Sequence, residues 1–179
     1  MKTELRYGII GAGSMGREHI ENIKVMGGAV VTAISDPNKS SQEAALAMAP
    51  GATVFADHRA LLDSGLVDAV VISTPNDTHA AVLKDVLATD LAVFVEKPLA
   101  TTVEDLKSIL SWDEKRSAMT WMGLEYRFMP PVAEAIARAK EGEAGKIHQV
   151  SIREHREPFY PKVDNWNRFA ERTGGTLVE

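Results

Sequence analysis

The sequence has 179 residues, of which 45% are hydrophobic and 25% are charged, and its formal net charge is −5. This length suits one complete domain and part of a second. The 20 basic residues are outnumbered by 25 acidic ones and form no long run, so we expect no nucleic-acid partner. The absence of cysteine excludes disulfides, thiolate catalysis and zinc–thiolate sites, and we predict no metal site.

The hydrophobic segments are too short for a signal peptide or a membrane span. Met1–Arg6 contains no apolar core of the kind that signal peptides carry. The longest apolar stretches are strand-sized, such as Ala69–Ile72, and none approaches the roughly 20 residues that cross a bilayer. We therefore expect a cytoplasmic protein that does not associate with membranes.

Up to Gly123, strand-sized apolar runs alternate with amphipathic segments. The runs are continuous, which is typical of strands buried on both faces of a parallel sheet. They are Tyr7–Ile10, Ala29–Ile34, Thr53–Phe55, Ala69–Ile72, Leu91–Val95 and Met119–Met122. The helices predicted between them are Ser14–Met26, Ser40–Ala49, His58–Ser64, Asp77–Thr89 and Thr101–Trp112. Residues 1–123 are thus predicted to form a doubly wound α/β domain, a parallel Rossmann sheet of strand order 3-2-1-4-5-6.

Three of these helices carry sequence signals at their ends. The first ends at Gly27–Gly28, a typical C-cap. Ser40-x-x-Glu43 and Thr101-x-x-Glu104 read as capping boxes, so we expect the second and fifth helices to begin there.

The pattern changes after Gly123. A helix is predicted from Pro130 to Lys140, and the alternating residues 147–155 favour an antiparallel strand. One helix and one strand cannot form a core. Residues 124–179 are therefore predicted to be the start of an incomplete α+β domain with an open antiparallel sheet.

A G-x-G-x-x-G motif lies between the first predicted strand and the first predicted helix. In dinucleotide-binding folds its glycines allow a tight turn, the approach of a pyrophosphate and close helix–strand packing, while the helix N-terminus faces the anion. The alternative is a glycine-rich structural turn, but the flanking strand and helix favour a dinucleotide site. The contacts predicted from this turn are Gly11, Gly13, Ser14, Met15 and Gly16.

An acidic residue follows the second predicted strand. Asp36 lies 20 residues after Gly16, where a carboxylate accepts hydrogen bonds from the adenosine ribose and repels a 2′-phosphate. We therefore expect NAD rather than NADP. Two alternatives stay open: Asp36–Asn38 is also favourable turn sequence, and Lys39 and Ser40 are close enough to hold a 2′-phosphate if Asp36 turns away.

Polar residues follow the fourth and fifth predicted strands, whose carboxyl ends border the ligand in such folds. Ser73–His79 supplies hydroxyls, an amide and an imidazole, although it also suits the start of a helix, and a lone histidine is more often structural. Lys97, between Glu96 and Pro98, is either part of a surface turn or a partly desolvated lysine with a lowered pKa that transfers a proton. A cis peptide before Pro98 would redirect Lys97.

Taken together, these motifs resemble the Gfo/Idh/MocA oxidoreductases, the family of glucose-fructose oxidoreductase and inositol dehydrogenase. The resemblance extends over essentially the whole chain. The matching segments are Gly11–Gly16, Asp36–Pro37, Ser73–His79, Glu96–Pro98, Tyr126–Pro130 and Asn165–Arg168.

The resemblance implies an enzyme that moves a hydride between a nicotinamide and a carbinol carbon of a sugar or an inositol-like polyol while a base takes the hydroxyl proton. Lys97 would be the catalytic proton-relay residue. The cofactor contacts implied are Ser73, Thr74, Pro75, Asn76, His79, Glu96, Lys97 and Arg127. The substrate contacts implied are Lys97, Arg127, Trp166 and Arg168.

The family pattern continues with G-G-x-L-x-D and then G-x-H-x-x-D, whose histidine is usually assigned as the acid/base. Gly174–Glu179 matches only the first of these, with Glu179 in place of Asp. The resemblance therefore implies a truncated dehydrogenase, weakly active or inactive alone, whose longer parent is active and homo-oligomeric. The alternatives are a non-catalytic nucleotide-binding module and a remnant without a ligand.

Overall fold

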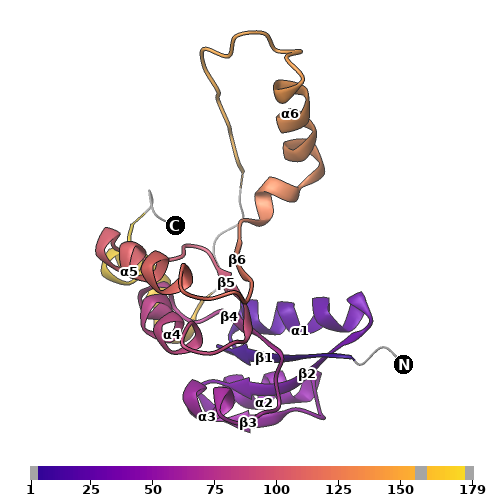
Figure 1. Cartoon of the computed structure of the whole chain (residues 1–179), viewed down its shortest axis with the longest axis vertical. Helices are drawn as coiled ribbons and strands as arrows, with labels where there is room; N and C mark the ends of the chain where they lie inside the picture. The colour runs from indigo at the N-terminus through magenta and orange to yellow at the C-terminus, as the bar shows by residue number, and fades with distance from the viewer. Residues whose placement is uncertain (1–3, 156–160, 176–179) are drawn as a thin grey trace. The chain divides into compact units, whose positions relative to one another are not determined.

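The computed structural model describes residues 4–155 and 161–175, and its first unit is built on a six-stranded parallel sheet (Figure 1). The strand order is β3-β2-β1-β4-β5-β6, which confirms the predicted order. The strands are β1 (Leu5–Ile10), β2 (Ala29–Ser35), β3 (Thr53–Phe55), β4 (Ala69–Ile72), β5 (Ala92–Glu96) and β6 (Thr120–Gly123). The helices between them are α1 (Ser14–Met26), α2 (Lys39–Met48), α3 (His58–Leu62), α4 (His79–Val86) and α5 (Val103–Asp113), with a 3₁₀ turn, η1 (Asn76–Thr78), before α4.

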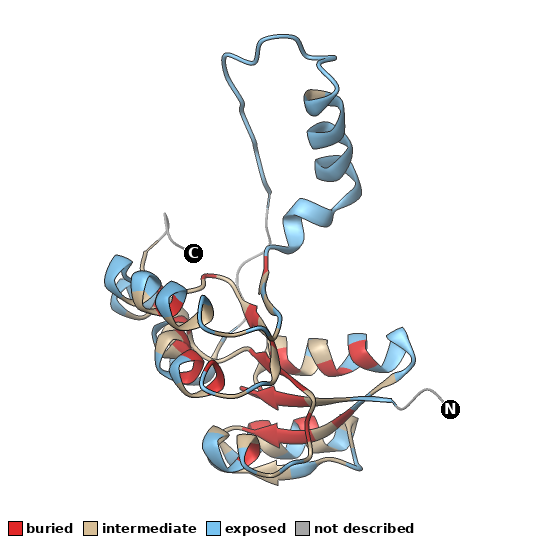
Figure 2. Cartoon of the chain, in the orientation of Figure 1, coloured by how far each residue is buried: buried red, intermediate tan, exposed pale blue. Residues whose placement is uncertain are grey.

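Hydrophobic side chains bury both faces of the sheet. One cluster packs α1 and α2 against it through Ile20 and Ala45, and the other packs α4 and α5 against it through Leu83 and Ile109. All four residues of β4 are buried, as expected for a continuous apolar strand between two helical layers (Figure 2). The core therefore fixes the carboxyl ends of β1, β4 and β5 at one edge of the sheet.

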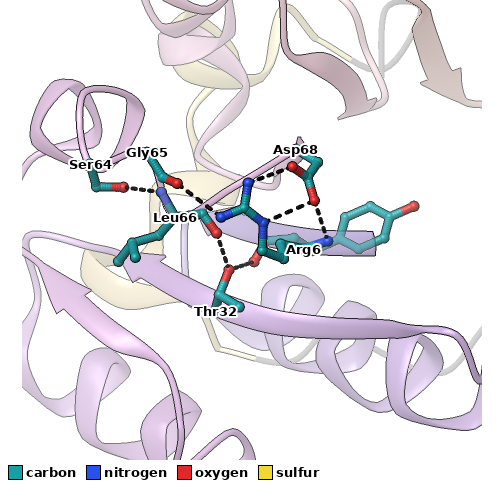
Figure 3. Close-up of polar contacts among 7 residues, drawn as sticks. Arg6, Thr32, Ser64, Gly65, Leu66 and Asp68 are labelled. Atoms are coloured by element: carbon teal, nitrogen blue, oxygen red, sulfur yellow. Dashed lines mark hydrogen bonds and ion pairs between the residues drawn. The ribbon is translucent and has the colours of Figure 1, made fainter. Parts of the chain in front are cut away.

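An arginine–carboxylate pair holds the opposite, amino-terminal edge (Figure 3). Arg6 on β1 donates from Nη2 to Asp68 Oδ1 over 2.6 Å and from Nε to Asp68 Oδ2 over 3.1 Å. The pair lowers the pKa of Asp68, chiefly through this side-chain hydrogen bond. Nearby, Thr32 Oγ1 donates to Leu66 O over 2.7 Å, so β1, β2 and the loop before β4 are joined. These contacts serve the fold.

Two helix starts differ from the prediction. The N-cap of α2 is Asn38, whose side chain accepts from Ser41 N over 3.1 Å, so the capping box predicted at Ser40 is wrong. The N-cap of α5 is Thr102 rather than Thr101, with Asp105 N as the donor over 3.1 Å. Both segments contain neighbouring residues that can each cap a helix, so the sequence pattern alone does not decide between them. Gly27 ends α1 with φ of 67°, as predicted.

The second unit comprises residues 124–161. It contains a 3₁₀ turn, η2 (Glu125–Phe128), and α6 (Pro130–Lys140), which confirms the predicted helix. The antiparallel strand predicted over residues 147–155 is not observed, and these residues are irregular and exposed (Figure 2). A strand is stabilised by hydrogen bonds to a neighbour, and the described part of this unit offers none.

Residues 162–175 belong by their contacts to the sheet unit, although the sequence assigned all of 124–179 to a second domain. They form η3 (Val163–Arg168) and α7 (Ala170–Thr173). The predictions made for residues 156–160 and for the motif residues 176–179 lie outside the described structure. Across residues 4–155 and 161–175, no helix has the length and apolar character needed to cross a membrane.

Candidate cofactor site

The turn between β1 and α1 depends on two glycines for its shape. Gly11 has φ of +94°, and a Cβ atom there would lie 2.7 Å from the backbone of Ser73 and Thr74. A Cβ atom on Gly16 would lie 2.0 Å from Gly11 O. Ser73 supports the turn by donating from Oγ to Gly11 O over 2.7 Å. Gly11 and Gly16 are therefore required by the packing of the turn itself.

Gly13 differs from its two neighbours in the motif. Its φ of −65° suits any residue, and an added Cβ would meet no described atom within 4 Å. It is the N-cap of α1, and no side chain among the described residues caps this helix. The turn therefore presents open space and helix N-terminal N–H groups, the combination that accepts a phosphate group.

The Asp36 carboxylate lies against this turn rather than facing solvent. Its Oδ2 accepts from Ala12 N over 2.7 Å, and its Oδ1 accepts from Asn38 N over 2.8 Å. Asp36 thus both shapes the turn after β2, one of the alternatives considered, and places a negative charge beside the glycine turn. Each oxygen keeps capacity to accept a further hydrogen bond.

The loop after β4 is held by contacts within the unit. Thr78 Oγ1 lies 2.8 Å from Thr74 Oγ1 and 2.7 Å from Pro75 O. The single hydroxyl proton of Thr78 can be donated to only one of these two acceptors at a time. Asn76 is buried and donates from Nδ2 to Thr173 O over 3.4 Å. The predicted residues Ser73–Asn76 are therefore brought beside the glycine turn through Ser73, and their loop is anchored on its far side by α7.

His79 is completely buried between two loops of the site. Its Nδ1 lies 2.7 Å from Pro98 O and its Nε2 lies 3.0 Å from Thr74 O. Desolvation by burial lowers the pKa of His79, outweighing these carbonyls and the nearby acids. A neutral ring has one N–H, which we assign to the shorter contact with Pro98. Both ring nitrogens contact main-chain carbonyls, so the buried His79 side chain holds together the loop after β4 and the loop after β5.

Glu96 is held by the helix that begins at the glycine turn. His19 Nε2 on α1 lies 2.8 Å from Glu96 Oε1, and the His19 ring packs edge-on to Phe94 with centroids 5.0 Å apart. Glu96 Oε2 accepts from Lys97 N over 3.3 Å, and the peptide bond from Lys97 to Pro98 is cis. Sequence reasoning missed His19, because its partner Glu96 lies 77 positions away in the sequence.

The segment 162–175 reaches the same edge of the sheet. Lys162 Nζ donates to Ser14 Oγ over 2.7 Å, and Arg172 Nε donates to Asp77 Oδ2 over 3.1 Å. The predicted residues Trp166 and Arg168 lie on η3, between these two anchors. Arg127 lies on η2 of the other unit.

Comparison with known proteins agrees with this geometry. The sequence profile of the Gfo/Idh/MocA oxidoreductase family, described as having an NAD-binding Rossmann fold, matches residues 5–124. The chain belongs to this family. The match covers the whole six-stranded sheet and its glycine turn, so the resemblance inferred from the motifs is confirmed.

The Gfo/Idh/MocA proteins most similar to this chain include several dehydrogenases. An inositol 2-dehydrogenase from an Arthrobacter species is 34% identical over 163 residues, which cover 90% of this chain and 48% of that protein. The myo-inositol dehydrogenase of Lactobacillus casei, solved with NAD(H) and myo-inositol, superposes with a TM-score of 0.74 and 33% identity over 77% of this chain and 42% of its own. A levoglucosan dehydrogenase solved with NADH and levoglucosan gives 0.73 and 27%, over 79% of this chain and 40% of its own. The chain therefore spans about half the length of the relatives it matches.

Proposed function

We propose that the protein is an NAD-dependent dehydrogenase of a sugar or an inositol-like polyol, and that residues 1–123 hold its cofactor. The observation that carries this proposal is the open, uncapped turn at Gly13, because the fold itself has no need for a glycine there. A pyrophosphate approaching the backbone would explain the missing side chain. When bound, NAD supplies the hydride acceptor.

The adenosine end is assigned to the side of the turn where Asp36 lies. Its carboxylate is fixed by Ala12 N and Asn38 N, so it cannot turn away without losing both hydrogen bonds. A fixed carboxylate accepts from ribose hydroxyls and repels a 2′-phosphate. This supports a preference for NAD over NADP.

Calorimetric titration with NAD⁺ and NADP⁺ tests this assignment. We expect NAD⁺ to bind about tenfold more tightly or better, the value of one lost charge-assisted contact. Asp36→Asn keeps the size and one acceptor oxygen but removes the charge, so the ratio of the two affinities should fall towards one. Equal affinities in the unaltered chain would contradict the role given to Asp36, and no binding of either nucleotide would contradict the cofactor site.

Lys97 is proposed as the residue that takes the substrate hydroxyl proton. Two buried or nearly buried side chains support its backbone from either side: Glu96 accepts from Lys97 N, and His79 contacts Pro98 O. The lysine itself is half-buried at the carboxyl end of β5. Such a position suits a group that exchanges a proton with a bound substrate beside the cofactor.

The substrate class is inferred from relatives named as inositol and levoglucosan dehydrogenases. Trp166 and Arg168 on η3, together with Arg127, are proposed substrate contacts. The test is formation of NADH by the whole protein with NAD⁺ and myo-inositol. Lys97→Met should abolish most of the turnover while leaving the Kd for NAD⁺ nearly unchanged. Turnover close to that of the unaltered protein would remove Lys97 from the mechanism.

A further inference from the structure

The His19 side chain joins helix α1 to the carboxyl end of β5. His19 Nε2 lies 2.8 Å from Glu96 Oε1, and the exposed fractions of these two side chains are 17% and 13%. A carboxylate has no proton to donate, so Nε2 of His19 is the donor in this contact. The hydrogen bond is therefore charge-assisted and largely shielded from water, which makes it one of the stronger kinds of side-chain contact.

The two oxygens of the Glu96 carboxylate have different partners. Oε1 contacts His19, and Oε2 accepts from Lys97 N over 3.3 Å. The second contact is long for a hydrogen bond between an N–H group and an oxygen, so alone it would hold the carboxylate weakly. A glutamate side chain also loses conformational entropy when it is held in one orientation. The shorter contact from His19 therefore fixes the orientation in which Glu96 supports the Lys97 peptide group.

The packing of α1 on the sheet does not require a polar side chain at this position. Ile20 and Ile23 on the same helix are buried and supply its apolar contacts with the sheet. The His19 ring packs edge-on to Phe94 with centroids 5.0 Å apart, a contact that a phenylalanine ring could also make. What the imidazole adds to this packing is the N–H donor to Glu96.

We propose that His19 is a positioning residue for the proton transfer assigned to Lys97: it fixes Glu96, and Glu96 fixes the backbone from which the lysine side chain extends. This inference rests on the proposed function, because it requires Lys97 to take the substrate proton. Helix α1 begins at the glycine turn, so one helix serves both the cofactor and the lysine loop. A misplacement of about 1 Å between reacting groups can cost about 100-fold in rate, so a small movement of this loop matters.

A second histidine provides a matched control. His58 Nε2 on α3 lies 2.8 Å from Asp85 Oδ2 on α4, and the exposed fractions of these side chains are 19% and 24%. The two histidines thus join elements through the same kind of contact at similar burial, but His58 and Asp85 have no place in the proposed site. His19→Phe and His58→Phe each remove the N–H donor and keep an aromatic ring. His19→Gln removes the ring and keeps an N–H donor.

Amide hydrogen exchange in the full chain measures the first step directly, because Lys97 N–H is the group that Glu96 accepts from. His19→Phe should accelerate exchange at Lys97 by about tenfold or more, whereas His58→Phe should leave it unchanged. His19→Gln should stay close to the unaltered chain. The amides of β4, in the centre of the sheet, report general loss of stability. Equal acceleration there and at Lys97 would mean that His19 only stabilises the fold.

Turnover of the whole protein with NAD⁺ and myo-inositol measures the second step. His19→Phe should lower kcat by about tenfold or more, and His19→Gln should recover most of this loss. His58→Phe should leave kcat unchanged. Melting temperatures of the two phenylalanine variants give the structural cost of each lost contact, so a loss of kcat confined to His19→Phe is not an effect of stability.

Four results would overturn the inference. They are unchanged exchange at Lys97 in His19→Phe, unchanged kcat in that variant, an equal loss of kcat in His58→Phe, and a kcat for His19→Gln no higher than that of His19→Phe. Failure of the unaltered protein to form NADH is a separate outcome, which overturns the proposed function and this inference with it. The exchange measurement does not depend on turnover, so it shows independently whether His19 supports the Lys97 peptide group.

Discussion

At the scale of single residues, two glycines of the turn have different roles: packing requires Gly11, whereas Gly13 is assigned to ligand binding. Gly11→Ala places a side chain at φ of +94° and 2.7 Å from the backbone of Ser73, so we expect the free energy of unfolding to fall by at least about 1 kcal/mol. Gly13→Ala meets no described atom within 4 Å, so the fold should keep its stability. Its methyl group should instead obstruct the pyrophosphate and weaken NAD⁺ binding by about tenfold or more.

Thermal unfolding and calorimetric titration of the two alanine variants check this pair of expectations. Each variant serves as the control for the other, since the same substitution is made two residues apart. A large loss of stability in Gly13→Ala, or unchanged NAD⁺ affinity in that variant, would show that the open space at the turn does not receive the cofactor.

A second residue-scale prediction concerns pH and the Arg6–Asp68 pair. Arg6 lowers the pKa of Asp68 from the ordinary value of 3.8, so near and below that pH the unfolded chain binds the proton more readily than the folded one. The pair therefore stabilises the fold fully above this pH, and the contribution is lost as the pH falls through the folded pKa. Asp68→Asn should lower the melting temperature at pH 7, and the difference should shrink in acid.

The exposed Asp63 supplies the control for that measurement. Asp63→Asn should change the melting temperature little at either pH. NAD⁺ affinity should be the same in both variants, because Asp68 lies at the amino-terminal edge of the sheet and the glycine turn lies at the other. A gap between Asp68→Asn and the unaltered chain that persisted at low pH would rule out the charge of Asp68 as its source.

Residues of the site were predictable where their signal is local in the sequence. The glycine turn and Asp36 lie within one strand–helix–strand unit, so spacing alone places them together. His19 contacts Glu96 across 77 positions and Lys162 contacts Ser14 across 148, and no pattern within the sequence joins such pairs. The burial of His79 and its two carbonyl partners also required the structure, because no local pattern in the sequence predicts them.

At the scale of elements, the start of α5 provides a test of the observed cap. Thr102 Oγ1 accepts from Asp105 N over 3.1 Å and donates to Asp105 Oδ2 over 2.8 Å. Thr102→Ala should lower the free energy of unfolding by about 1 kcal/mol. Thr101→Ala, at the position favoured by the sequence pattern, should be nearly neutral. Denaturant unfolding of both variants decides between them, and an equal loss in both would mean that the two threonines share the cap.

Elements were predicted more reliably than their ends, for a physical reason. The strand β4 consists of four consecutive apolar residues, and all four are buried. A continuous apolar run of this length is typical of a strand that is covered by helices on both faces. A helix start is decided among neighbouring residues that cap almost equally well, such as Asn38 and Ser40. Residues 147–155 have a strand pattern, but residues 4–155 and 161–175 offer them no partner strand, and a pattern alone cannot supply hydrogen bonds.

At the scale of the whole molecule, the strand order followed from connection rules, whereas the division into units did not. Right-handed crossovers between parallel strands leave few orders for six strands, and the observed order is the expected one. The return of residues 162–175 to the sheet unit depends on individual polar contacts, such as Arg172 with Asp77, that have no signature in composition. A domain boundary drawn where the pattern changes therefore missed it.

The two units should also differ in resistance to proteolysis. Residues 141–155 are irregular and exposed, with few buried apolar contacts, so opening them to a protease should cost little free energy. Trypsin at low concentration should therefore cut first at Lys140, Lys146 or Arg153, while Lys24 and Lys84 on helices of the sheet unit stay intact. Mass spectrometry of the early fragments identifies the sites. If the first cuts fall within residues 5–123 instead, the sheet unit is the less stable of the two, and the cofactor site would need the rest of the protein to hold its shape.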